Sequence, residues 1–178
     1  MDFRANYIAH DKEVFDIALG PDEFTFMTTG ADGCVRLFDT RTQDTFRIIF
    51  ETSDGTPMTT VDWNLHNTNL ILVPVLDKNE IYILDQRNSF SPFSILKDHT
   101  NVVNNARWAP NSYTNLVSVG DDKKAFIWEI STETIKPEEV ILEYEAEKEI
   151  ENVDWGEVTE DWVGIVYGNS VECLKIKE

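Results

Sequence analysis

The feature that most constrains the fold is a phrase that occurs four times along the chain. Copies at 58–87, 98–130 and 150–176 follow a first copy at 10–41. Each copy consists of short apolar, β-prone segments broken by Gly, Asp, Asn or Pro. Successive copies are 44, 45 and 47 residues apart. The matching positions behind these spacings are Leu19, Trp63, Trp108 and Trp155. Repetition at this length indicates a stack of similar small units.

Each unit reads as four strands. In the first copy, VFDIAL (14–19), FTFMTT (24–29) and CVRLFD (34–39) are separated by the turn sequences GPDE and GADG, and TFRIIF (45–50) follows. The third strand ends in a Trp-Asp-like pair in three copies: Phe38-Asp39, Leu84-Asp85 and Trp128-Glu129. This pattern is typical of WD-type β-propeller blades. It predicts an all-β, WD40-type β-propeller with four visible blades, either partial and open or part of a ring completed by missing N-terminal blades.

One domain is expected over residues 1–178. Its predicted blades cover approximately 10–50, 58–96, 102–144 and 150–176. FRANYI (3–8) is predicted as an outer strand of a preceding blade, or of the last blade if the chain closes on itself, because the fourth copy has no fourth strand of its own. Pro74 lies inside LILVPVL and predicts a bulge or an early strand end, since proline cannot donate to the sheet.

The chain is strongly acidic, with a net charge of −18 and a pI near 4.4. Such a surface repels phosphate, so direct nucleic-acid binding is not expected and basic partners are favoured. Nine Glu fall between 129 and 151, which is either a solvated connector or a docking site for a basic segment. No apolar run reaches about 18 residues and the N-terminus has no secretory signal, so no membrane association is predicted.

Catalytic and metal-binding motifs are not found. The sequence has no GxSxG, HExxH or glycine-rich phosphate loop, and no cofactor or metal is predicted. Cys34 and Cys173 are interpreted as small buried hydrophobes in a reducing compartment, since they form no CxxC pair. An enzyme is therefore not expected.

Two copies contain a matched polar set. His10 and His99 each precede a first strand, and Asp32 and Asp122 each occupy a turn six residues before an aromatic side chain, Phe38 or Trp128. Thr29 and Ser118 are the hydroxyl candidates on the second strands. In WD repeats such residues hydrogen-bond in series inside one blade, because a buried Asp must have its acceptors filled. Both histidines are therefore predicted to be structural, and Phe38 cannot donate as a Trp would.

The position shared by Leu19, Trp63, Trp108 and Trp155 is predicted to pack between neighbouring blades. Two further residues, Arg41 and Arg87, each follow the final Asp of their copy by two positions, giving Asp39-x-Arg41 and Asp85-x-Arg87. Each Arg either pairs with its own Asp across a turn or presents a bidentate fork to a partner. These four residues are the candidate partner-binding set.

Several phrases resemble one WD-repeat family, the Transparent Testa Glabra and anthocyanin-regulator adaptors of plants. Their animal relatives are the seventh of the cullin-four-associated factors. The similar phrases are AHDKEVFDIAL (9–19), GADGCVRLFDTR (30–41), ILDQR (83–87), VNNARWAP (103–110), AFIWEI (125–130) and EIENVDW (149–155). The resemblance covers nearly the whole chain and corresponds to the C-terminal half of a family member.

The resemblance implies a non-enzymatic scaffold, seven-bladed in the family, found in nucleus and cytoplasm. Implied partners are dual-specificity tyrosine-regulated kinases, and transcription factors of the helix-loop-helix and MYB classes. A second implication is a substrate receptor of a cullin-RING ubiquitin ligase, for which the family motif is Trp-Asp-x-Arg; here Phe38 and Leu84 replace the Trp. A propeller-type hydrolase is the alternative from another class, and it needs His and carboxylates converging at the ring centre. Three arrangements are considered, a fragment of a longer protein, a closed four-blade ring and a ring of two copies. An incomplete propeller from a truncated or divergent gene product is favoured.

Overall fold

The molecule is described by a computed structural model over residues 6–42, 45–131, 138–159 and 161–176. Within these ranges the secondary structure consists of β-strands and turns, with no helix. The strands form four antiparallel sheets, here called blades 1 to 4 in chain order. Blades 1 to 3 have four strands each and blade 4 has three. The predicted all-β architecture with four blades is confirmed.

Each blade is a meander in which consecutive strands are neighbours. Blade 1 consists of β1 (Val14–Leu19), β2 (Thr25–Gly30), β3 (Cys34–Asp39) and β4 (Phe46–Glu51). Blade 2 consists of β5 (Asp62–Trp63), β6 (Leu70–Pro74), β7 (Ile81–Asp85) and β8 (Ser94–Leu96). Blade 3 consists of β9 (Val103–Trp108), β10 (Asn115–Gly120), β11 (Lys124–Glu129) and β12 (Glu139–Glu145). Blade 4 consists of β13 (Asn152–Trp155), β14 (Trp162–Tyr167) and β15 (Ser170–Lys175).

The tight turns between second and third strands follow from their sequence. In GADG the left-handed residue is Gly33, with φ of 76°, and in GDDKK the equivalent residue is Lys123, with φ of 66°. A carboxylate oxygen of Asp32 accepts the N–H of Cys34, and Asp122 accepts that of Lys124. These bonds hold the backbone in a region that lysine rarely adopts.

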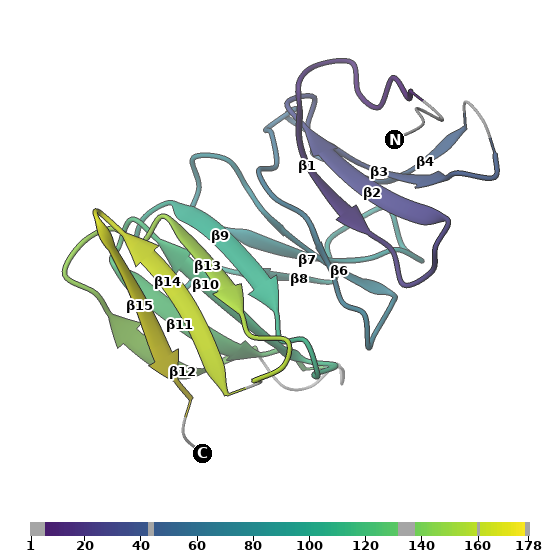
Figure 1. Cartoon of the computed structure of the whole chain (residues 1–178). Helices are drawn as coiled ribbons and strands as arrows, with labels where there is room; N and C mark the ends of the chain where they lie inside the picture. Colours follow the sequence, from purple (N-terminus) through teal and green to yellow (C-terminus); the bar gives the residue numbers. More distant parts are fainter. Residues whose placement is uncertain (1–5, 43–44, 132–137, 160, 177–178) are drawn as a thin grey trace.

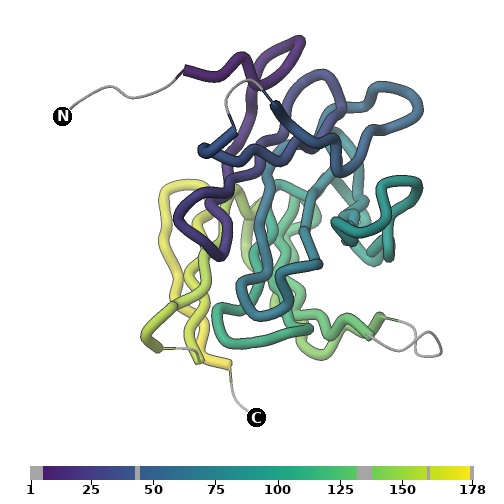
Figure 2. Tube along the Cα trace, turned by 90° about the vertical axis from the view of Figure 1, so that its right-hand side faces the viewer, coloured from purple at the N-terminus to yellow at the C-terminus, as the bar shows by residue number. Residues whose placement is uncertain are grey.

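The first strands of successive blades lie side by side, so the blades share one axis. β1 lies beside β5, β5 beside β9, and β9 beside β13. Blade 1 and blade 4 are at opposite ends of the molecule (Figure 1). The tube view shows the same succession of meanders from the purple to the yellow end of the chain (Figure 2).

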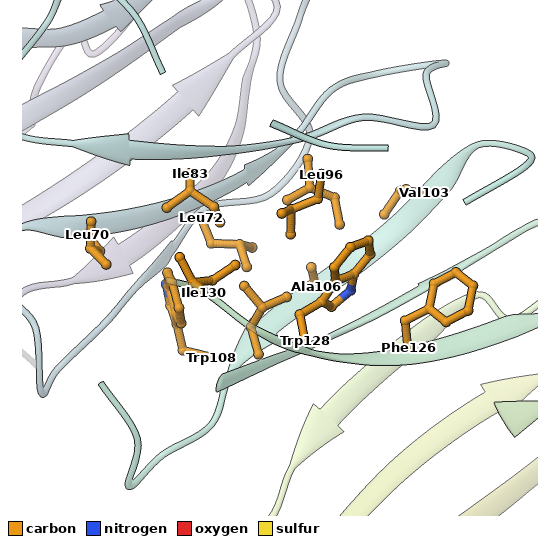
Figure 3. Packing of buried hydrophobic residues seen from close by; sticks show 12 residues of the cluster. Leu70, Leu72, Ile83, Leu96, Val103, Ala106, Trp108, Phe126, Trp128 and Ile130 are labelled. Atoms are coloured by element: carbon orange, nitrogen blue, oxygen red, sulfur yellow. The ribbon is translucent and has the colours of Figure 1, made fainter. Parts of the chain in front are cut away.

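The core is divided into three apolar clusters, one between each pair of consecutive blades. Figure 3 shows the cluster between blades 2 and 3, where Trp108 and Trp128 from blade 3 lie against Leu72, Ile83 and Leu96 from blade 2. A blade therefore keeps its apolar side chains dry by packing on its neighbour, as in other repeat architectures.

The structure does not show the predicted outer strand FRANYI over the residues described. Residues 6–8 are not in a strand, and residues 3–5 lie outside the described ranges. The ring of Tyr7 contacts Phe26 and Phe38 edge-on, at centroid distances of 5.7 and 5.9 Å. This aromatic packing places Tyr7 on blade 1. Pro74 ends β6, as its missing N–H predicts.

Candidate functional site

The polar set of blade 3 forms one buried series of hydrogen bonds. Trp128 Nε1 donates to Ser118 Oγ over 2.8 Å, and Ser118 Oγ lies 2.7 Å from His99 Nε2. His99 Nδ1 lies 2.8 Å from Asp122 Oδ2. Burial lowers the pKa of His99, although Asp122 raises it in part. A neutral imidazole that donates from Nδ1 and accepts at Nε2 satisfies both partners.

Blade 1 contains a similar series with a different hydroxyl. His10 Nδ1 lies 2.8 Å from Asp32 Oδ1, and His10 Nε2 lies 2.8 Å from Thr28 Oγ1. The predicted residue, Thr29, is wrong: it donates to the Thr59 carbonyl instead. Neighbouring residues of a strand point to opposite faces, so a one-residue error moves the side chain to the other face. Thr28 lies four residues before Asp32, as Ser118 lies before its turn Asp, and this spacing could have identified it.

Sequence reasoning missed Arg36, which completes the polar set of blade 1. Its side chain is buried and donates from Nη2 to Asp32 and Asp11, over 2.9 and 2.8 Å, and from Nη1 to the Ala9 carbonyl over 3.0 Å. Burial opposes ionisation of Asp32, but bonds from His10 and a backbone N–H lower its pKa overall. The sequence signal was a charged residue between the apolar residues Val35 and Leu37 of β3.

Phe38 lies outside this hydrogen-bonded series, as expected for a side chain without a donor. It is 2% exposed and stacks on Phe26, with ring centroids 4.9 Å apart. Both ring nitrogens of His10 and of His99 are thus paired with an Asp and a hydroxyl inside their blades. The described residues contain no group of three or more His, Cys, Asp or Glu placed to bind a metal.

The shared inner-strand position differs sharply between blade 1 and the others. Trp63, Trp108 and Trp155 are 5%, 5% and 8% exposed, each in the cluster shared with the preceding blade. The prediction for Leu19 is wrong, because this side chain is 75% exposed. The described chain has no blade before blade 1 to cover it.

The two Asp-x-Arg sequences adopt the same local geometry. Arg41 donates from Nε to Asp39 over 2.9 Å and from Nη2 over 2.6 Å, and Arg87 makes the same bonds, with the same distances, to Asp85. The bidentate bond from Arg41 lowers the pKa of Asp39 to about 2. Each Arg thus pairs with its own Asp, yet the two Arg side chains remain 58% and 69% exposed.

The cysteine prediction holds for one residue of two. Cys34 is buried and Cys173 is exposed, on the outer strand of blade 4. Burial raises the pKa of the Cys34 thiol. The described ranges contain no helix with the length and hydropathy needed to cross a membrane.

The chain is similar in sequence to known WD-repeat proteins. The family described as WD40, WD domain, G-beta repeat, matches residues 2–39 and 90–129. The DDB1- and CUL4-associated factor 7 homolog of Dictyostelium discoideum is 36% identical over 173 residues, which is 97% of this chain and 53% of that protein. An uncharacterized WD repeat-containing protein of Schizosaccharomyces pombe is 26% identical over 98% of the chain and 54% of its own length. A WD repeat-containing protein of Saccharomyces cerevisiae is 31% identical over 72% of the chain and 28% of its own length.

The chain thus spans about half the length of the first two relatives. Its four blades share one axis, and tryptophans from the inner strands fill the interfaces between them. Together with the WD40 matches, these features show that the chain is a WD-repeat protein with the fold of a partial β-propeller.

Proposed function

We propose that the chain is a non-enzymatic scaffold that binds protein partners through the two ends of its blades. The observation that carries this proposal is the repeated Asp-Arg fork: Asp39 with Arg41, and Asp85 with Arg87, occupy the same position in neighbouring blades. Two exposed guanidinium groups on a rigid frame favour recognition of a partner with carboxylates or carbonyl oxygens. Loops held by such a frame are common binding elements.

The two ends of the blades present different charged groups. The Arg forks lie where third strands end, whereas the turns that join second to third strands lie at the opposite end of each blade. Those turns carry carboxylates, among them Asp77 and Asp121. Exposed guanidinium groups at one end and carboxylates at the other allow two partners to be held at once, a carboxylate- or carbonyl-rich one by the forks and a basic one by the turns.

A substrate receptor of a cullin-RING ligase is the more specific form of this proposal. The Dictyostelium relative is named for association with DDB1 and CUL4. The motif Trp is replaced here by Phe38 and Leu84, which are 2% and 1% exposed. A residue buried at this position packs inside the blade, so its replacement leaves the surface offered by the neighbouring Arg in place. This supports a docking role for the forks despite the missing Trp.

The ligase proposal is tested by titrating the whole chain with purified DDB1. Replacing both Arg41 and Arg87 with Ala is expected to weaken binding at least about tenfold, as loss of interface arginines commonly does. Lys97→Ala is the matched control, because Lys97 is a cation of similar exposure, 56%, that pairs with the carboxylate of Glu80 outside the two forks. No binding by the unmodified chain would reject the receptor function. An unchanged affinity of the double variant would reject the forks as its site.

For the opposite end of the blades, we propose a basic segment of a kinase of the dual-specificity tyrosine-regulated type, or of a helix-loop-helix or MYB factor, bound in nucleus or cytoplasm. The net charge of −18 supports a basic partner. A purified kinase of this type should bind more weakly as salt rises, because exposed charges are screened. Asp77→Asn with Asp121→Asn should weaken it further, and binding insensitive to salt and to both changes would exclude this surface.

A further inference from the structure

A groove opens on the outer rim of the molecule between blades 1 and 2. Its cavity volume is about 280 Å³. Blade 1 contributes the end of β4 and the loop after it, and blade 2 contributes its second-to-third-strand turn, β7, β8 and the loop that joins them. Every residue of this lining belongs to an interface inside the described chain, away from the outer faces of blades 1 and 4.

One side of the groove is a loop that takes the place of strand in blade 2. β8 has three residues, whereas β4 has six and β12 has seven. The preceding residues, 86–93, form a loop that is tied to β7 at both ends. The Asn88 N–H donates to the Asp85 carbonyl over 2.8 Å, and the Phe93 N–H donates to the Ile83 carbonyl over 2.7 Å. The loop is therefore held in place, and its middle lines the groove.

The floor of the groove is aromatic. Phe50 from blade 1 and Tyr82 from blade 2 meet edge to face, with ring centroids 5.8 Å apart. In blade 3, Phe126 occupies the position that Tyr82 holds in blade 2 and is 4% exposed, whereas Tyr82 is only partly buried. At the rim, Ile95 is 39% exposed and Phe90 is 97% exposed. An aromatic floor beside an almost fully exposed ring is typical of a surface that a partner covers.

The charged groups of the groove leave one carboxylate without a cation. Lys78 Nζ lies 3.8 Å from Asp54 Oδ2. Glu51 also lines the groove and is exposed, and its carboxylate forms neither a hydrogen bond nor an ion pair with the residues that the structure describes. Glu80, which is outside the lining, is paired with Lys97 over 2.7 Å. A positive charge placed near Glu51 therefore complements the groove.

The size of the groove fits one side chain of a partner protein. Pockets for small molecules commonly measure about 300–1,000 Å³ and enclose most of their ligand. This groove is smaller and is open to solvent. A large apolar side chain fits between the aromatic floor and Phe90. Glu51 follows Phe50 directly in β4, so an Arg or Lys close to that apolar residue in an extended segment reaches the carboxylate.

We propose that the groove between blades 1 and 2 binds a short extended segment of a partner protein, in which a large apolar side chain lies next to an arginine or lysine. The apolar side chain packs on Phe50 and Tyr82 beside Phe90, and the cation pairs with Glu51. The chain carries a net charge of −18, which attracts such a segment from a distance. The groove shares no residue with the Asp-Arg forks or with the turn carboxylates of the opposite end, so it is a separate site.

Selection from a library of short random peptides on the whole chain tests the class of ligand. Enriched peptides are expected to combine a large apolar residue with an Arg or Lys within two positions of it. As free synthetic peptides, they should bind the Arg41→Ala, Arg87→Ala double variant as tightly as the unmodified chain, because the forks lie outside the groove. No enrichment, peptides of another pattern, or loss of binding in the fork variant would overturn the proposal.

Two substitutions should weaken binding of a selected peptide. Phe90→Ser should raise its dissociation constant at least about tenfold, because an aromatic contact is lost. Glu51→Gln should raise it about two- to fivefold, as for one exposed ion pair. Val158→Ser and Glu23→Gln are the matched controls, since both residues are exposed and lie outside the groove. Thermal unfolding should be unchanged in all four variants. Equal losses in groove and control variants, or no loss in the groove variants, would contradict the proposal.

A third substitution should act in the opposite direction. Lys78→Gln removes the cation nearest to Asp54, so a second carboxylate of the groove becomes free for the ligand. The affinity for a selected peptide should rise about two- to fivefold, and the rise should shrink as salt is added. Lys12→Gln, at an exposed lysine outside the groove, controls for the change in net charge. A misfolded variant cannot produce such a gain. An affinity that falls or stays the same would contradict a cationic ligand.

Discussion

Blades 1 and 3 build the same polar set on faces with different surroundings. In blade 3, His99, Ser118, Asp122 and Trp128 form a complete series, and blade 2 covers it. In blade 1, the series ends at Thr28, and Arg36 takes the position held by Phe126 in blade 3. No blade of the described chain covers it there, and the segment of residues 6–13 lies over part of it.

The comparison shows that local hydrogen bonds and burial by a neighbour are separable. The contact between the turn Asp and its His is made in both blades, because it needs residues of one blade alone. The Trp at the shared inner position needs an adjacent blade, and Leu19 shows what the position becomes without one. In a stacked architecture the stability of a unit is its own plus that of its interfaces.

The largest expected effect is at a covered interface. Trp108→Ala should lower the free energy of unfolding by about 3–5 kcal/mol, because it leaves a large cavity between blades 2 and 3. Leu19→Ala, the equivalent change on blade 1, should stay within about 0.5 kcal/mol when measured in urea at a dilution that keeps the chain monomeric. Equal effects at the two positions would contradict the blade register.

The next effect separates the two histidines. His99→Ala leaves Asp122 and Ser118 buried with a partner missing, and should cost about 3 kcal/mol. His10→Ala should cost about 1 kcal/mol, because Arg36 still bonds to Asp32. Urea unfolding of both variants provides the measurement. A larger loss for His10→Ala would reverse the comparison.

Acid should weaken blade 3 through His99. Burial lowers the pKa of His99 in the folded chain, so below about 6.5 the unfolded chain binds more protons. The contribution of His99 to stability is therefore present above that pH and falls as the pH drops. His99→Gln should flatten this part of the curve of unfolding free energy against pH. If His99→Gln left this curve unchanged, a group other than His99 would be responsible for the loss of stability in acid.

Asp62, at the covered interface between blades 2 and 3, should change stability with pH in the opposite direction. Burial raises its pKa to about 6, although the bond from Trp108 opposes this. Between about pH 4 and 6 the folded chain then binds more protons than the unfolded chain, and stability falls as pH rises. Asp62→Asn should remove this decline and raise stability at pH 7 by about 2 kcal/mol. Asp154→Asn, its exposed equivalent on blade 4, is the control and should leave stability near that of the unmodified chain.

The smallest effect tests the last bond of the series. Trp128→Phe keeps an aromatic ring but removes the Nε1–H that reaches Ser118, and should cost about 1 kcal/mol. It would make blade 3 resemble blade 1, where Phe38 already occupies this position. Thermal unfolding of this variant beside His99→Ala shows whether the two bonds belong to one network. Strictly additive losses in the double variant would argue against it.

The repeat made most of the fold predictable from sequence. The period and the turn residues correctly indicated strands and four blades, because every blade meets the same steric and burial demands. The burial of Trp63, Trp108 and Trp155 between blades was predicted correctly for the same reason. Within the polar set, the residues that recur at fixed spacing were identified correctly, including His99, Asp122 and Trp128.

The errors share a physical cause, since each depends on what lies beside a residue rather than on the residue itself. Leu19 and Cys173 are exposed because they lie on the free faces of the end blades. Tyr7 packs on aromatic residues of blade 1, which no strand pattern in FRANYI indicates. Arg36 is buried through contacts with residues distant in sequence, and periodicity carries no information about them.

The most direct test of neighbour-dependent blades is amide hydrogen exchange on the dilute, monomeric chain, resolved by strand. The slowest exchange is expected in β6, β7, β10 and β11, whose blades are covered on both sides, and faster exchange in β1 and β15. Equal protection in all four blades would contradict the account, because each blade would then be stable without its neighbour.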